Sequence, residues 1–269
     1  MRTFTAAKGV LLALGLAALA GPAGAQTEAN RTFVAVYSIH APQWRDAGDF
    51  NYSFAQTGST YQASATREMK GVAGALLQRR QDYTYSVRGW VAADGTLHPA
   101  QYQHQGGRRR ADRPNGRLIR TAFTADDAVT TAVPGPPNMG DPPATAEQRR
   151  NTIDQLTAIA ALVTTTGDPC ARTLRVYMDG RARFDFVMTP NGNVTINNAA
   201  YRGPGVRCRV QFRPIAGFGD PQEAATLTFL LARTADGLWA PVVIEMPTDE
   251  VGVVRLEARR ITINGTRLR

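Results

Sequence analysis

Residues 81–105, QDYTYSVRGWVAADGTLHPAQYQHQ, decide the fold class of this chain. From Tyr83 to Gly89 the odd positions are mostly apolar and the even positions are polar. This alternation is typical of a half-buried β-strand. Asp94-Gly95 then supplies a turn, because glycine tolerates the left-handed conformation that tight turns require. Residues 96–105 return as the partner strand, so the sequence predicts an antiparallel hairpin.

The same pattern continues on both sides of this hairpin. Segments 49–56 and 60–67 form a second predicted hairpin around Thr57-Gly58-Ser59, and Asn115-Gly116 precedes a strand at 118–124. The Gly-rich stretch 69–77 fits either a strand or a helical turn. The remaining predicted strands are 32–38, 174–178, 183–189, 194–201, 207–214, 225–233, 239–246 and 252–263.

One helix interrupts the strands. Residues 134–143, PGPPNMGDPP, form a Pro-rich loop that supports neither a helix nor a strand ladder. Thr145 and Gln148 then match a capping box, and apolar residues from Ile153 to Val163 recur at helical spacing. We therefore expect one amphipathic helix over about 145–164.

Together these elements predict a mostly β protein: a strongly curved antiparallel sheet or open β-barrel of about a dozen strands. The amphipathic helix should pack on or in that sheet, because its apolar stripe needs a face to cover. Residues 26–269 are expected to form a single β-rich domain.

The first 25 residues have the features of a signal peptide. Arg2 and Lys8 precede a 12-residue apolar run, and Ala23-Gly24-Ala25 supplies the small residues of a cleavage site before Gln26. The run is shorter than the roughly 20 residues that span a bilayer, and no later segment is long and apolar enough. We therefore expect an exported periplasmic protein without a transmembrane segment in the mature chain.

The charge of the chain suggests its partners. The full sequence has a net charge of +9, and removing Arg2 and Lys8 leaves +7. A basic periplasmic protein meets anionic lipid, lipopolysaccharide and acidic envelope proteins, whereas nucleic acid is not expected there. Arg108, Arg109 and Arg110 form the densest cationic run, which suits either an anion or lipid-headgroup site or a solvated hairpin tip.

The two cysteines, Cys170 and Cys208, predict a structural disulfide, because the count is even and the expected compartment is oxidising. They do not form a CxxC redox motif. The three histidines lie far from them in sequence, so no metal site is predicted.

No catalytic constellation is evident, and no cofactor is expected. His98 and His104 lack a serine or cysteine nucleophile placed by a motif, and Asp179 is assigned to turn chemistry. On the predicted strand 252–263, one of Arg259 and Arg260 is expected to point inward, because neighbouring strand residues face opposite sides.

Several segments together resemble the family of domains of unknown function numbered 3108 (DUF3108). The resemblance covers about residues 90–262. It depends on residues 94–102 (DGTLHPAQY), 153–158 (IDQLTA), 177–185 (YMDGRARFD), 208–218 (CRVQFRPIAGF) and 239–242 (WAPV). It implies an exported bacterial envelope protein with a strongly curved β sheet or barrel. The family helix usually opens with Asp-Pro, and Gln155 stands here in place of the proline.

The leading hypothesis is a non-catalytic periplasmic binding or scaffolding protein. It would support cell-envelope integrity and hold an apolar or peptide-like partner on its curved sheet. The alternative is an envelope hydrolase that acts on peptidoglycan or lipid. A nucleophile within about 3 Å of a general base would favour the hydrolase, and a continuous apolar cleft without one would favour binding.

Overall fold

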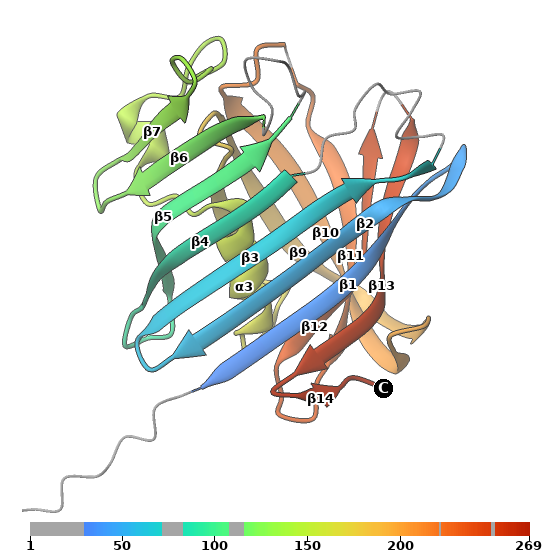
Figure 1. Cartoon of the computed structure of the whole chain (residues 1–269). Helices are drawn as coiled ribbons and strands as arrows, with labels where there is room; N and C mark the ends of the chain where they lie inside the picture. Colours follow the sequence, from blue (N-terminus) through green and yellow to red (C-terminus); the bar gives the residue numbers. More distant parts are fainter. Residues whose placement is uncertain (1–29, 72–82, 108–115, 221, 249–250) are drawn as a thin grey trace, which may run out of the picture.

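The computed structural model describes residues 30–71, 83–107, 116–220, 222–248 and 251–269. These residues form one antiparallel sheet that curls into a nearly closed barrel (Figure 1). The prediction of a strongly curved, mostly β fold is therefore confirmed. The predicted signal peptide at 1–25 lies outside the described residues.

The sheet consists of two meanders, in which each strand pairs with the next one along the chain. The first meander contains β1 (Arg31–Ala41), β2 (Trp44–Thr57), β3 (Thr60–Met69), β4 (Tyr83–Val91), β5 (Leu97–Gly106), β6 (Arg117–Phe123) and β7 (Ala128–Val133). The second contains β8 (Arg172–Met178), β9 (Ala182–Asn197), β10 (Arg202–Ala216), β11 (Ala225–Arg233), β12 (Trp239–Thr248) and β13 (Gly252–Ile263), with β14 (Thr266–Arg267) beside β13.

The two meanders meet where β1 pairs with β13, so that Phe33 lies opposite Ile263. The predicted hairpins at 49–67 and 81–105 appear as β2–β3 and β4–β5. β7 was not predicted, although Ala128–Val133 is rich in β-branched residues. Most of the expected strands therefore lie where the alternation placed them.

The helical region is split, which corrects the prediction of one helix over 145–164. The Thr145 capping box is present, but its helix, α2 (Ala146–Arg149), ends after one turn. Asn151 then adopts a positive φ of 55°, and Ile153 forms a bridge with Val176 on β8. Tertiary pairing thus removes Ile153 from the expected helical stripe, and α3 (Gln155–Val163) begins afresh at the cap Asp154.

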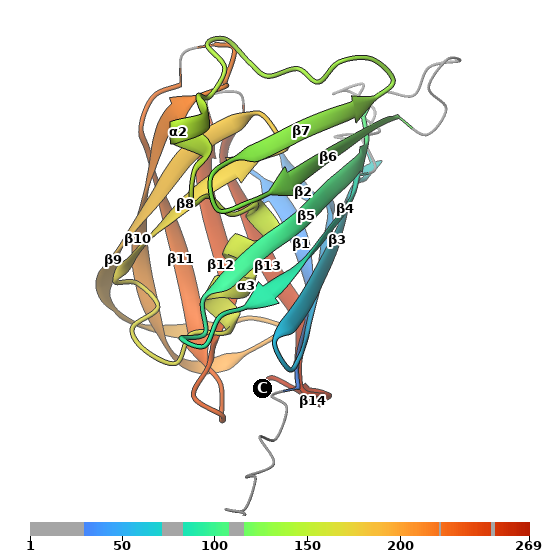
Figure 2. The ribbon, with the colours of Figure 1, turned by 90° about the vertical axis from the view of Figure 1, so that its left-hand side faces the viewer.

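The inside of the barrel is filled by α3. It packs against β3, β4, β5, β8 and β12, so it lies between the two meanders (Figure 2). Leu156 and Ala160 join a core cluster that contains residues of both meanders, whereas Ala158 and Leu162 join a second cluster formed with β8–β12. Both sides of one helix are thus buried in the packed part of the barrel.

Two further strand predictions are wrong. Segments 183–189 and 194–201 were predicted as two separate strands, but β9 runs continuously from Ala182 to Asn197 through Asn191-Gly192. The pairing with β10 shifts there, between Val206 and Cys208, and Gly192 has a φ of 86°. Arg259 and Arg260 are both exposed, because a bulge in the β1–β13 pairing breaks the alternation at this point.

The barrel seam, the gap between the edge strands β7 and β8, is covered by the segment that joins them. Ile153 N donates to Arg175 O, and Tyr177 N donates to Ile153 O, both at 2.9 Å. These bonds pair the segment before α3 with the free edge of β8. Covering an edge strand protects it from pairing with other chains.

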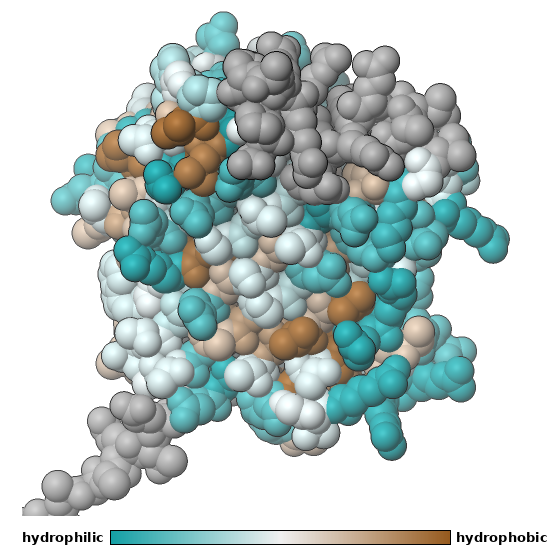
Figure 3. Space-filling model, in the orientation of Figure 1, coloured by the Kyte–Doolittle hydropathy of each residue, from teal (hydrophilic) through white to brown (hydrophobic). Residues whose placement is uncertain are grey.

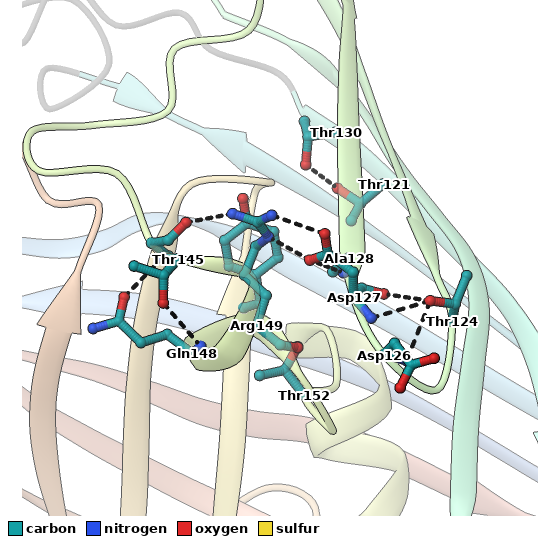
Figure 4. A network of polar contacts seen from close by, with 12 residues as sticks. Thr121, Thr124, Asp126, Asp127, Ala128, Thr130, Thr145, Gln148, Arg149 and Thr152 are labelled. Carbon is teal, nitrogen blue, oxygen red and sulfur yellow. Dashed lines mark hydrogen bonds and ion pairs between the residues drawn. The ribbon is translucent and has the colours of Figure 1, made fainter.

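Helix α2 bridges the seam. It binds Asp127, just before β7, on one side (Figure 4) and Arg183, on β9, on the other. Arg149 Nε and Nη2 donate to the two carboxylate oxygens of Asp127, at 2.8 and 2.9 Å. The Arg149 guanidinium holds the pKa of Asp127 below its usual value. From the second meander, Arg183 Nε donates to Gln148 O at 2.7 Å. In the described residues the two edges are thus joined through α2 rather than by a shared ladder.

We expect Arg149→Met and Asp127→Asn each to lower the free energy of unfolding by about 1–2 kcal/mol, because a bidentate pair is stronger than an ordinary surface pair. The double variant should lose less than the sum of the two single losses. Urea denaturation measures all three. Arg150→Met, at an exposed neighbouring arginine, is the control. Fully additive losses would show that the two side chains do not interact.

The outer face of the sheet is mostly polar or neutral. In Figure 3 the hydrophobic residues on the visible face form small separate patches rather than one broad surface. Val34 and Trp90 are among the exposed large hydrophobic residues, and Trp90 stacks on His98. Among the described residues, no helix has the length and apolar character needed to cross a membrane.

Candidate functional site

An apolar cavity of about 440 Å³ lies inside one end of the barrel, near the β1–β2 and β12–β13 hairpins. Both meanders and α3 contribute to its wall. Its apolar lining includes Ile39, Trp44, Phe50, Ile159, Val254 and Leu256. Side chains from three sides thus enclose a space that falls within the range of about 300–1,000 Å³ typical of small-molecule sites.

The inward aromatic residues form part of the core and of the barrel lining. Tyr37 and Tyr52 are almost fully buried, whereas Phe50 and Tyr85 line the cavity. The Tyr37 hydroxyl donates to Pro241 O at 2.8 Å, which satisfies its buried polar group.

The first turn of α3 is held rigidly at the base of the cavity. Asp154 accepts hydrogen bonds from Leu156 N, Thr157 N and the Thr157 hydroxyl, at 2.9, 3.1 and 2.6 Å. The Tyr52 hydroxyl donates to Leu156 O at 3.0 Å, and the Tyr61 and Thr157 hydroxyls lie 2.8 Å apart. The helix cap is therefore tied to β2 and β3, and this fixes where Leu156 and Ile159 face the cavity.

Asp154 itself is fully buried. Burial raises its pKa to about 6, although the hydrogen bonds from Thr157 and Leu156 act in the opposite direction. A buried carboxylate with no cationic partner is costly to ionise. As the N-cap of α3, Asp154 supports the cavity wall by holding the first turn of the helix in place.

A polar cluster forms one side of the cavity. Asp179 Oδ1 accepts from the Tyr102 hydroxyl at 2.8 Å and from Gln155 Nε2 at 2.6 Å, and it lies 3.3 Å from His104 Nδ1. Burial lowers the pKa of His104, although the Asp179 carboxylate acts in the opposite direction. The lowered pKa disfavours the charged form of the imidazole, and His104 Nδ1 also lies 3.3 Å from the Tyr102 hydroxyl.

A second hollow, of about 400 Å³, lies behind this polar cluster. Arg117, Asn138 and Arg181 line it, and it shares Met178 and Asp179 with the apolar cavity. The cluster therefore separates an apolar compartment from a polar one. Among the described residues, no group of three or more His, Cys, Asp and Glu side chains could hold a metal ion.

The predicted disulfide lies away from the cavity, and the predicted anion site lies outside the described residues. Cys170 and Cys208 are placed as a disulfide, with Cα atoms 5.2 Å apart, in the core between α3 and β8–β11. Arg108, Arg109 and Arg110 fall outside the described residues. The two cysteines thus lie close enough to form a disulfide, and the arginine run stays a prediction.

Sequence reasoning missed Arg67, Gln155 and the second role of Asp179. Asp179 does occupy a turn, with a φ of 53°, as predicted. Its contact with Tyr102 joins residues 77 positions apart, and no local signal indicates it. For Arg67 a signal existed, because it continues the inward series of Tyr61, Ala63 and Ala65 on β3.

The chain was compared with known families, curated proteins and solved structures. A family model described as "Protein of unknown function (DUF3108)" matches residues 36–259. No curated protein matches the chain. Among solved structures, it is similar to a crystal structure of a β-barrel-like protein of domain of unknown function DUF1849 from Brucella abortus. That similarity has a TM-score of 0.48 and 10% sequence identity, and it covers 87% of this chain and 97% of the other.

Proposed function

Because the chain belongs to the DUF3108 family, whose function is unknown, we propose a function from its own geometry. The protein is a non-catalytic binding protein that holds an apolar ligand in the cavity at the end of its barrel. The observation that carries this proposal is the lining itself, in which aliphatic and aromatic side chains from both meanders and α3 enclose about 440 Å³.

The proposed place of action is the bacterial periplasm, in support of the cell envelope. The basic, apolar and small-residue segments within 1–25 support export. The buried pair Cys170 and Cys208 suits an oxidising compartment. Apolar molecules there need a carrier or a site that shields them from water, and a rigid barrel supplies one.

The exposure of the hydroxyl groups favours binding over the alternative of an envelope hydrolase. Among the described residues, three hydroxyl groups hydrogen-bond to a carboxylate: Thr157 to Asp154, Tyr102 to Asp179 and Thr234 to Asp236. Thr234 is only 7% exposed. Thr157 and Tyr102 are each 0% exposed. A nucleophile must reach its substrate, and Thr157 instead completes the cap of α3. Absence of catalysis stays a prediction.

Filling the cavity tests this proposal. We expect Ile159→Trp to weaken binding of the neutral dye Nile red at least about tenfold, because the larger side chain occupies the ligand's space. Fluorescence titration measures the affinity. Ile215→Trp is the matched control, since Ile215 is 39% exposed on β10 and does not line the cavity. Equal binding by both variants, or none by the unaltered protein, would refute the proposed function.

A further inference from the structure

Among the described residues that line the cavity, Arg67 is the one cation, and Gln155 and Asp179 are the other polar side chains. Arg67 lies near the end of β3, and its guanidinium carbon stands 4.6 Å from the centre of the Tyr83 ring. In the described part of the chain it forms no ion pair, and its Nε is buried without a hydrogen-bond partner. Buried donors in native proteins are almost always satisfied, by protein or by a bound molecule.

Gln155 provides a second unsatisfied atom in the same wall. Its Nε2 donates to Asp179 Oδ1, but its buried Oε1 has no partner among the described residues. A donor on Arg67 and an acceptor on Gln155 thus remain open at one cavity. An entirely apolar ligand would leave both unpaired, at a cost in free energy.

The acidic residue of the lining is already engaged. Asp179 accepts hydrogen bonds from Tyr102 and Gln155, lies beside His104 and forms no ion pair with Arg67. A guanidinium offers several N–H donors and matches the geometry of carboxylate and phosphate groups. Arg67 is therefore the residue available to a negatively charged ligand group.

We propose that the ligand is a single-chain amphiphile with an anionic head group. Its aliphatic chain fills the apolar cavity, its carboxylate or phosphate pairs with Arg67, and a neighbouring hydroxyl or N–H group donates to Gln155 Oε1. This inference depends on the proposed function, because it names the ligand class of the same cavity.

Probes with the same chain length and different head groups distinguish binding of an apolar chain from recognition of an anionic head group. The change in intrinsic tryptophan fluorescence, to which the cavity residue Trp44 contributes, and native mass spectrometry report binding of four probes below their micelle concentrations. These are tetradecanoate, 1-tetradecanol, tetradecyltrimethylammonium and a tetradecanoyl lysophosphatidylglycerol. We expect both anions to bind at least about tenfold more tightly than the alcohol, and the cation to bind most weakly. The tighter of the two anions identifies carboxylate or phosphate as the natural head group.

Variants of Arg67 test its role directly. Arg67→Met removes the charged guanidinium but keeps an unbranched side chain. It should reduce the affinity for both anions to that for the alcohol, whereas Arg67→Lys should retain part of the difference. Arg88→Met is the matched control, because Arg88 is exposed on the outer face of β4 and hydrogen-bonds Gln101. Thermal melting checks that each variant folds.

The possible failures are distinct. Equal binding of tetradecanoate and 1-tetradecanol, or unchanged anion affinity in Arg67→Met, would overturn the anionic head group and leave apolar binding intact. Preference for the cationic probe would assign the head group to Asp179 instead and overturn the inference. If none of the four probes binds, the proposed function itself fails.

Discussion

Replacing Cys170 or Cys208 with alanine is expected to lower the free energy of unfolding by about 3–4 kcal/mol. The bond closes a loop with a sequence separation of 38, and in the chain-entropy model its loss restores that much freedom to the unfolded chain. Alanine is preferred to serine because both positions are at most 2% exposed, so serine would bury a hydroxyl. Urea denaturation without reductant measures the change.

The two single variants and the double variant should lose similar amounts, because any one of them removes the same bond. Each should still fold, since the barrel buries an extensive core around α3 without the disulfide. Thiol titration of the denatured, unreduced protein should find no free thiols. Two free thiols in protein purified from the periplasm, or a loss below about 1 kcal/mol in the variants, would contradict the predicted role of the bond.

Replacing Asp154 with asparagine is expected to stabilise the protein at pH 7 and to have little effect near pH 4. The pKa of Asp154 in the folded protein, about 6, lies above the ordinary aspartate value of 3.8. Between these values the folded protein keeps a proton that the unfolded chain releases, so stability falls as the pH rises through this window. A rise of about two pKa units lowers the free energy of unfolding of the unaltered protein by roughly 3 kcal/mol at pH 7 relative to low pH. The asparagine variant avoids this loss because its side chain stays neutral.

The asparagine amide oxygen can still accept from Leu156 N and Thr157 N, so the cap of α3 is preserved. Asp154→Ala is the control, because it removes the cap and should destabilise the protein at both pH values. Chemical denaturation of all three proteins from pH 4 to pH 7 gives the comparison. A difference between aspartate and asparagine that does not change with pH would show that Asp154 does not titrate in this range.

The sheet could be predicted from the sequence because strands signal themselves locally. Alternation and turn residues predicted the β4–β5 hairpin correctly, with its turn at Asp94-Gly95. The failures occurred where distant segments decide the backbone. Ile153 has a helical spacing in sequence, but its bridge to Val176 on β8 outweighs that spacing and divides the helix.

The candidate site was less predictable for the same reason. The inward position of Arg67 follows from the alternation of inward and outward residues along β3. That it has no carboxylate partner among the described residues depends instead on how the two meanders meet. The same holds for Gln155. The resemblance to the DUF3108 family showed that it stands in place of a proline, but not what it contacts. Its contact with Asp179 requires the β8–β9 turn to approach α3.

The pairing of β1 with β13 also has a consequence for how the chain could be rearranged. All other pairs within the barrel join strands that are neighbours in sequence, and the Pro-rich segment 134–143 lies between the two meanders. Joining the chain ends and opening the chain at this segment would give a circular permutant in which β13 precedes β1. Apart from the short β14, which would lie between β13 and β1, every strand of that permutant would then pair only with its sequence neighbours, because the native sheet is an up-and-down meander whose first and last long strands lie side by side.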